Sequence, residues 1–228
     1  MVEIVPAILP QSFADMEAKL AQVHDAVSSV QIDVVDGIFA PNTTWPYQGG
    51  ERFSSIIAQD EGLPFWEDLD FEFDCMLAHP EKEVPNYISA GASRVVVHSE
   101  GKDLRAALET FQKDRAGDLG IALGLALLPG ESAATFAQYR ELVDFVQVMG
   151  IANVGFQGKE FDARAIDLIT SLRADNPDLT IQIDGGVNIE NARALALAGA
   201  NRLIVGSAIF KAEDPREAIH LLGRAANR

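Results

Sequence analysis

Two kinds of apolar pattern alternate along the whole chain. Short runs rich in β-branched residues are typical of strands buried on both faces, and longer segments with apolar residues three or four positions apart are typical of amphipathic helices. The predicted strands span residues 3–8, 29–35, 69–77, 94–98, 121–127, 145–149, 180–184 and 202–205. The predicted helices span residues 13–23, 52–59, 80–92, 101–113, 132–143, 162–174, 188–200 and 214–228.

This regular alternation predicts the fold class. Several helical segments end in Gly-Ala or Asn, as expected where a helix stops and the chain reverses. Near-continuous apolar strands covered by helices imply a parallel sheet, and eight such units within 228 residues, uninterrupted by a linker, imply closure of that sheet. We therefore expect one (β/α)8 TIM barrel domain spanning residues 1–228, with a doubly wound open sheet as the alternative.

The composition of the chain limits which binding partners and which cellular compartment are expected. The chain carries 34 acidic residues against 18 lysines and arginines, a net charge of −16, which argues against a nucleic acid or an anionic membrane as partner. The single cysteine, Cys75, excludes an internal disulfide and fits a reducing compartment. No basic and apolar leader opens the chain, and no apolar run is long enough to span a bilayer, so we expect a cytoplasmic protein.

Candidate chemistry lies at the carboxyl ends of the predicted strands, where barrels of this kind carry their active sites. Asp33 and Asp184 stand at matching depths at the ends of the second and seventh strands, which favours a functional role for both. Asp36 precedes a glycine and is interpreted as a turn former. His98, followed by Glu100, either supplies an imidazole to the site or is an ordinary hydrogen-bonded residue of the barrel mouth.

Three glycine-containing turns follow late strands and together suggest a phosphate site. They are "NVGFQGKEF" (153–161), "DGGVN" (184–188) and "VGSAIF" (205–210). Glycine lets backbone N–H groups approach an anion, and the loops after the seventh and eighth barrel strands are a frequent phosphate site. A single such turn is more often only a tight loop, whereas three in succession favour phosphate.

At this point the sequence resembles the ribulose-phosphate 3-epimerase family, which consists of (β/α)8 barrels that invert C3 of a pentulose 5-phosphate. The resemblance is carried by "VPAILP", "IDVVDGIFAPNTTW", "DCMLAHPE", "VVVHSEG", "VQVMGIANVGFQGKEF" and "IQIDGGVNIENARALALAGANRLIVGSAIF". It implies that Asp33 and Asp184 are the two acid/base carboxylates. It also implies phosphate binding, largely through backbone N–H groups, by Gly155, Phe156, Gly158, Gly185, Gly186, Gly206 and Ser207.

The sequence departs from the resembled family where a metal is expected. The resemblance implies a divalent ion such as zinc, iron or manganese, held by two histidines and the two aspartates. Gln31 stands at the first histidine position, and Met76, or Cys75 if the register slips by one residue, stands at the second. We therefore expect no metal bound by the usual ligand set and assign no cofactor.

Smaller departures fall around the substrate. Ala7 stands where the family usually has serine, Leu128 where asparagine is usual, and Gln157 where the phosphate loop usually has glycine. Two aromatic residues of the loop after the second strand, Phe39 and Trp45, either close over a ligand or pack beneath that loop.

Three functions remain open from the sequence. One is an epimerase or isomerase of a ketose phosphate that works with two carboxylates and an altered metal site. Another is a relative that acts on a different sugar phosphate, and the third is a phosphosugar-binding barrel without turnover. In each case the expected partner is a small phosphorylated sugar, and a homo-oligomer is expected from the habit of the resembled family. Cys75 is interpreted as a buried apolar residue rather than a soft metal ligand.

Overall fold

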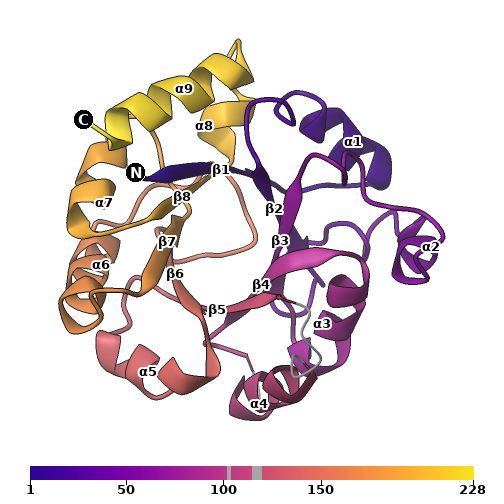
Figure 1. The fold of residues 1–228 in the computed structure, drawn as a ribbon, viewed down its shortest axis with the longest axis horizontal. Coiled ribbons are helices and arrows are strands. Elements are labelled where there is room, and N and C mark those ends of the chain that lie inside the picture. Colours follow the sequence, from indigo (N-terminus) through magenta and orange to yellow (C-terminus); the bar gives the residue numbers. More distant parts are fainter. Residues whose placement is uncertain (102–103, 115–119) are drawn as a thin grey trace.

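A computed structural model describes residues 1–101, 104–114 and 120–228 of the chain. Eight parallel strands follow one another around a closed barrel (Figure 1). They are β1 (Glu3–Ile8), β2 (Ser29–Val35), β3 (Asp70–Met76), β4 (Ala92–His98), β5 (Ala122–Leu127), β6 (Phe145–Met149), β7 (Thr180–Asp184) and β8 (Arg202–Val205). The first and last strands pair directly, with Glu3 beside Arg202 and Pro6 beside Val205. The predicted barrel is therefore confirmed, and the open-sheet alternative is wrong.

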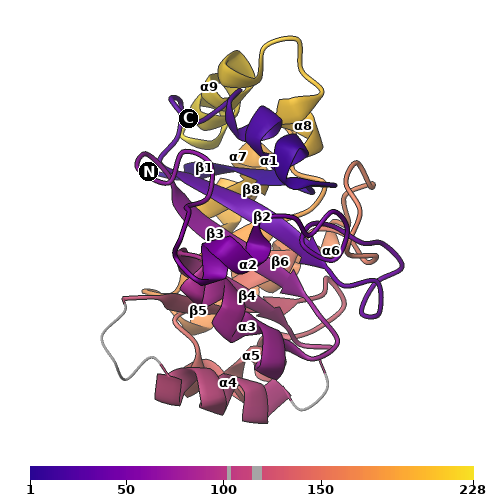
Figure 2. The ribbon, with the colours of Figure 1, turned by 90° about the vertical axis from the view of Figure 1, so that its right-hand side faces the viewer.

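The helices form a ring outside the barrel, as Figures 1 and 2 show. They are α1 (Phe13–Leu20), α2 (Phe53–Ile57), α3 (Pro80–Ser89), α4 (Leu104–Asp114), α5 (Ala133–Ala137), α6 (Arg164–Asp175), α7 (Ala192–Ala198), α8 (Ser207–Phe210) and α9 (Pro215–Ala226). Residues 102–103 of the helix predicted at 101–113 lie outside the described residues. The helix predicted at 132–143 is shorter than expected, because α5 ends early and a single 3-10 turn, Arg140–Leu142, follows it.

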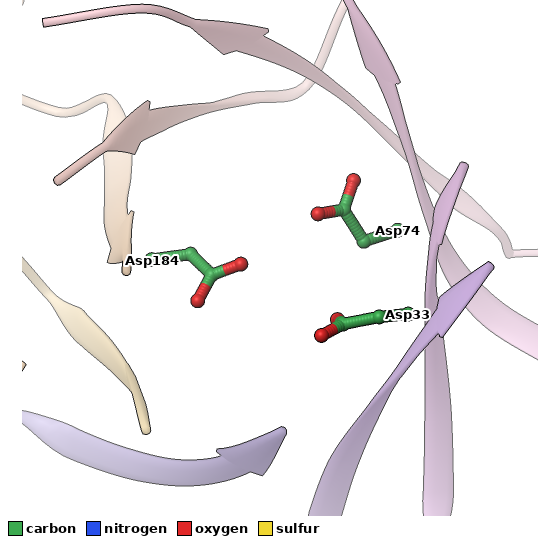
Figure 3. Close-up of side chains that lie close together, drawn as sticks. All are labelled: Asp33, Asp74 and Asp184. Atoms are coloured by element: carbon green, nitrogen blue, oxygen red, sulfur yellow. The ribbon is translucent and has the colours of Figure 1, made fainter. Parts of the chain in front are cut away.

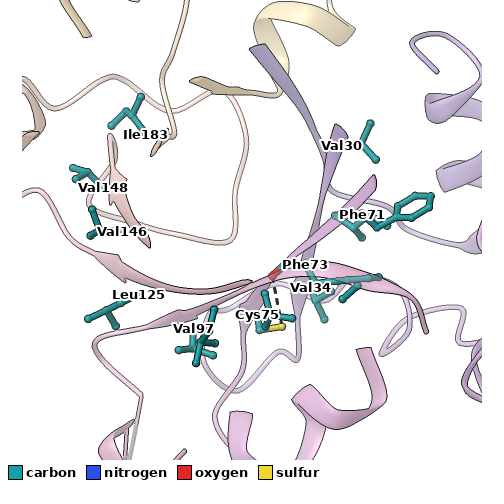
Figure 4. Close-up of a cluster of buried hydrophobic side chains, with 14 of the residues drawn as sticks. Val30, Val34, Phe71, Phe73, Cys75, Val97, Leu125, Val146, Val148 and Ile183 are labelled. Atoms are coloured by element: carbon teal, nitrogen blue, oxygen red, sulfur yellow. Dashed lines mark hydrogen bonds between the residues drawn. The ribbon is translucent and has the colours of Figure 1, made fainter. Parts of the chain in front are cut away.

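The outward faces of the strands build the main apolar core, between the barrel and its helices. Figure 4 shows valine, leucine, isoleucine and phenylalanine side chains projecting from the strands away from the barrel axis. Cys75 lies among them, fully buried, with its Sγ 3.9 Å from the carbonyl oxygen of Phe73. Each fully buried side chain of this size contributes about 1.5–3 kcal/mol through removal of apolar surface from water.

The inward faces carry a buried polar network in place of a purely apolar filling. Near the amino ends of the strands, Glu72 accepts hydrogen bonds from Arg94 at 2.7 Å and from Arg202 at 2.5 Å. The amide of Gln182 donates to Glu72 at 2.6 Å and to Gln147 at 2.6 Å. Because a buried charge without a partner is costly, this pairing explains how the barrel tolerates ionised groups in its interior.

Among the described residues, no helix is long and apolar enough to cross a membrane.

Candidate active site

One cavity opens at the carboxyl ends of the strands and collects most of the residues singled out from the sequence. Its wall includes Ala7, Asp33, Met76 and Asp184, together with all seven residues predicted to bind phosphate. Gln31 is fully buried beside this cavity, whereas Cys75 faces the helices. The structure thus brings together the predicted acid/base and phosphate residues, although their roles stay predictions.

Three carboxylates converge inside the barrel (Figure 3). Asp33 on β2, Asp74 on β3 and Asp184 at the end of β7 point toward one another, and one oxygen of each lies within 4.8 Å of the others. Sequence reasoning missed Asp74. The signal that could have found it is the alternation along β3: Asp74 pairs in register with Asp33, so both side chains enter the barrel at the same depth.

Gln31 joins the two predicted acid/base residues. Its Nε2 donates to Asp33 Oδ1 at 2.8 Å and to Asp184 Oδ2 at 3.0 Å. Its Oε1 is buried and has no hydrogen-bond partner among the described residues. The amide therefore presents its positive, N–H end to the two carboxylates and holds them at a fixed separation.

Asp74 is held by a different pair of donors. His98 Nε2 lies 2.8 Å from Asp74 Oδ1, and Gln147 Nε2 donates to Asp74 Oδ2 at 3.1 Å. Burial lowers the pKa of His98, but the charge of Asp74 and the hydrogen bond to it outweigh that effect, so the pKa lies above its usual value. The ring of Phe39 packs against the imidazole at a centroid distance of 5.3 Å. His98 is therefore a buried, hydrogen-bonded partner of Asp74.

Burial and nearby negative charges raise the pKa of both predicted acid/base residues. For Asp184, burial and then the charge of Asp74 raise the pKa to about 7, against an opposing hydrogen bond from Gln31. For Asp33, burial and then the charge of Asp184 raise the pKa well above its usual value. Raised pKa values allow one carboxyl to be protonated and the other ionised near neutral pH, which supplies one acid and one base in the same cavity.

These raised pKa values predict a pH-dependent stability. An unfolded aspartate ionises near pH 3.9, so between about pH 4 and pH 7 the folded chain retains protons that the unfolded chain releases. The free energy of unfolding should therefore fall as pH rises through this window. Asp184→Asn removes the buried charge and should be more stable than the native chain at pH 8, by about 1–3 kcal/mol, with a smaller difference at pH 5.

Urea unfolding of both chains at pH 5 and pH 8 measures this effect. Asp167→Asn, an exposed substitution on α6, serves as the control and should leave the stability difference between the two pH values unchanged. A native chain more stable at pH 8 than at pH 5 would contradict the assignment of raised pKa values to the carboxylate pair.

The residues at this site do not provide the metal ligands of the resembled family. The residue at the first histidine position, Gln31, directs N–H groups toward the carboxylates, where a cation needs an electron pair. Met76 lies at the second position and packs among apolar side chains, including Val35 and Met149, with a thioether that suits only soft metals. The alternative ligand Cys75 packs in the outer core, so of these two residues Met76 is the one that lines the cavity.

Spacing alone would let the three carboxylates approach one cation, but four of their six oxygens already have donors. Gln31 occupies one oxygen of Asp33 and one of Asp184, and both oxygens of Asp74 are bound by His98 and Gln147. A cation that used any of these four oxygens would compete with the donor already there. The chemistry of the site therefore rests on its own side chains.

The glycine turns come together at the other end of the cavity. Gly186 has a φ of 68°, and a Cβ there would lie 2.8 Å from the Cα of Phe161, so only glycine fits this close approach of two chain segments. Gly155, Gly158 and Gly206 border the same space, with Gly206 immediately before α8. Glycines gathered in this way allow backbone N–H groups to approach an anion, which suits a phosphate.

The loop after β2 is built as its sequence indicated. Asp36 Oδ1 accepts from the backbone N–H groups of Ile38 and Phe39 at 2.8 Å each, and Oδ2 accepts from Ala78 N–H at 2.7 Å. The turn-forming interpretation of Asp36 is therefore supported by its contacts. Trp45 is fully buried and packs on Phe13 and Phe53, so it stabilises the loop and does not face the cavity.

Comparisons with known proteins agree with this architecture. The family model described as "Ribulose-phosphate 3 epimerase family" matches residues 3–210. The chloroplastic ribulose-5-phosphate-3-epimerase of Arabidopsis thaliana is 33% identical over 223 residues, which cover 95% of this chain and 74% of that protein. The ribulose-phosphate 3-epimerase of Bacillus subtilis is 29% identical over 226 residues, covering 96% and 97% of the two chains. A crystal structure of 3-hexulose-6-phosphate synthase superposes with a TM-score of 0.70 at 21% identity, covering 98% of each chain, and this likeness shows the fold alone.

Proposed function

The chain belongs to the ribulose-phosphate 3 epimerase family, and from this premise we propose that it inverts C3 of a pentulose 5-phosphate such as ribulose 5-phosphate. The observation that carries the proposal is the placement of Asp33 and Asp184 on opposite sides of one cavity that also holds the glycine turns. The family consists of carbohydrate-phosphate epimerases, which are isomerases, so the catalytic question is how this particular site transfers protons.

The proposed reaction uses one of the two aspartates as a base and the other as an acid. In its carboxylate form one aspartate removes the proton from C3, which is acidified by the neighbouring carbonyl, and an enediolate forms. The other aspartate, as a carboxylic acid, then donates its proton to the opposite face of C3 and inverts the centre. The raised pKa of both groups supports this division, because a carboxylic acid at neutral pH requires such a shift.

In this proposal the amide of Gln31 stabilises the enediolate by hydrogen bonding, in place of a metal ion. An enediolate needs a positive group or hydrogen-bond donors near its oxygens. A protonated aspartate accepts the hydrogen bond from the N–H of Gln31 less strongly than an ionised one does. That N–H then becomes available to an enediolate oxygen. An amide stabilises such charge less than a metal ion does, so a slow epimerase is expected.

The replacement of the two imidazoles favours one other function. The cavity keeps the glycine turns of its phosphate end, but with Gln31 and Met76 in place of histidines it lacks the ligands for the metal ion that would best stabilise the enediolate. A barrel that binds a phosphorylated sugar without turning it over is therefore the second candidate.

The test is conversion of ribulose 5-phosphate to xylulose 5-phosphate by protein treated with a chelator and then dialysed. We expect conversion that neither the chelator nor added zinc, manganese or magnesium changes by more than about twofold. Conversion that appears only with added metal would contradict the amide-based site. Thermal stabilisation by ribulose 5-phosphate without conversion would support the binding function instead.

A further inference from the structure

Two chain segments interlock at the phosphate end of the cavity, each placing a side-chain nitrogen over a glycine of the other. The amide of Gln157, from the loop after β6, lies over Gly206: a Cβ on that glycine would be 2.5 Å from Gln157 Nε2. The ammonium of Lys211, just after α8, lies over Gly158: a Cβ there would be 3.2 Å from Lys211 Nζ. The hydroxyl oxygen of Ser207 lies 3.9 Å from the same point beside Gly158.

The ammonium of Lys211 has no ion-pair partner in the described part of the chain, whereas Lys19, for example, pairs with Asp15 at 2.8 Å. The N–H of Lys211 donates to the carbonyl of Ser207 at 3.1 Å, which fixes the main chain at this residue, while the side chain is exposed and reaches over Gly158. In a chain of net charge −16, an ammonium without an ion pair over a glycine that lines the cavity can pair with an anion bound there.

Gln157 adds a neutral donor on the other side of the same space. Its Nε2 donates to the carbonyl oxygen of Ala7 at 3.0 Å and so reaches from the loop after β6 to the end of β1. A phosphate oxygen accepts a hydrogen bond more strongly than a carbonyl oxygen does. Rotation of this amide from Ala7 toward an anion would therefore be favourable.

We propose that Lys211 and Gln157 bind the phosphate group of the substrate through their side chains, so that this chain recognises a phosphate dianion by a cation as well as by backbone N–H groups. The inference rests on the phosphate end of the proposed function, but it does not require that epimerisation takes place. It also accounts for binding of a dianion close to three carboxylates, whose repulsion an unpaired lysine offsets.

Calorimetric titration with inorganic phosphate and with ribulose 5-phosphate, at low ionic strength, tests the proposal. Lys211→Met keeps the length of the side chain and removes its charge. It should raise both dissociation constants about tenfold to a hundredfold, as expected for loss of a hydrogen bond between charged groups. Lys211→Arg should restore most of the affinity, and Gln157→Ala should raise the constants about threefold. Lys82→Met, at an exposed position of α3, is the matched control and should change neither constant.

The outcomes separate this proposal from the proposed function. Phosphate binding that depends on Lys211 supports the inference even if no xylulose 5-phosphate is formed. Equal affinity of the native chain and Lys211→Met for both ligands would overturn it while leaving the proposed epimerase intact. A native chain that binds neither ligand would overturn both the phosphate site and the role of Lys211.

Discussion

Asp184→Asn is expected to slow conversion of ribulose 5-phosphate to xylulose 5-phosphate by about 10²- to 10⁴-fold, the range for loss of a general acid or base. Asparagine has nearly the shape of aspartate and keeps an oxygen that accepts the N–H of Gln31, so the cavity should retain its form. What it loses is the ability to take or give a proton. Proton NMR follows the conversion, and circular dichroism checks that the variant is folded.

Two further variants serve as comparisons. Asp33→Asn should slow conversion by a similar factor, because inversion needs one proton-transferring group on each face of C3. Asp167→Asn, which changes an exposed aspartate on α6, should convert the substrate at the native rate. Conversion at the native rate in Asp184→Asn would sink the two-carboxylate mechanism and direct attention to Asp74, the third acid in the cavity.

The second large effect concerns metal binding. The double substitution Gln31→His and Met76→His is expected to convert a chain without stoichiometric zinc into one that holds about one zinc ion per molecule, because two imidazoles and two carboxylates form a four-coordinate set. Both positions lie on inward faces, Gln31 between the two carboxylates and Met76 on the cavity wall. Removal of the Gln31 amide also frees the oxygens of Asp33 and Asp184.

Metal content after dialysis against zinc, together with the increase in melting temperature on adding zinc, measures the gain. The control variant carries Gln31→His together with Met76→Leu. It offers only one imidazole and should bind zinc much more weakly. Stoichiometric zinc or manganese in the dialysed native chain would show that the carboxylates hold a cation after all, and the amide-based site would have to be abandoned.

Local patterns predicted the strands better than the helices. Five strands begin and end at the predicted residues, because a run of buried β-branched residues is interrupted sharply by polar or glycine residues. They are β1, β2, β6, β7 and β8. The segment 132–143 was predicted as one helix, but α5 has no side-chain cap and no acidic residue in its first turn, and it ends after Ala137. Apolar spacing alone does not record how weakly such a helix is held at its ends.

The site could be predicted where position along a strand decides it, and not where pairing between distant strands decides it. Asp33 and Asp184 follow from their places at strand ends. The contact of Asp74 with His98 joins residues on β3 and β4 and depends on how the strands are staggered around the barrel. The choice between Cys75 and Met76 needed only the knowledge that Asp74 faces inward, since successive side chains on a strand face opposite sides.

The buried network inside the barrel couples residues at its amino end to the carboxylates of the active site. Hydrogen bonds run without a break from Arg202 through Glu72, Gln182 and Gln147 to Asp74. A substitution at the amino end of the barrel, far from the substrate, therefore alters the carboxylate whose charge raises the pKa of Asp184. In a laboratory evolution experiment, gains in thermal tolerance at the barrel floor would thus carry shifts in the pH optimum with them, and the two traits could not be selected independently.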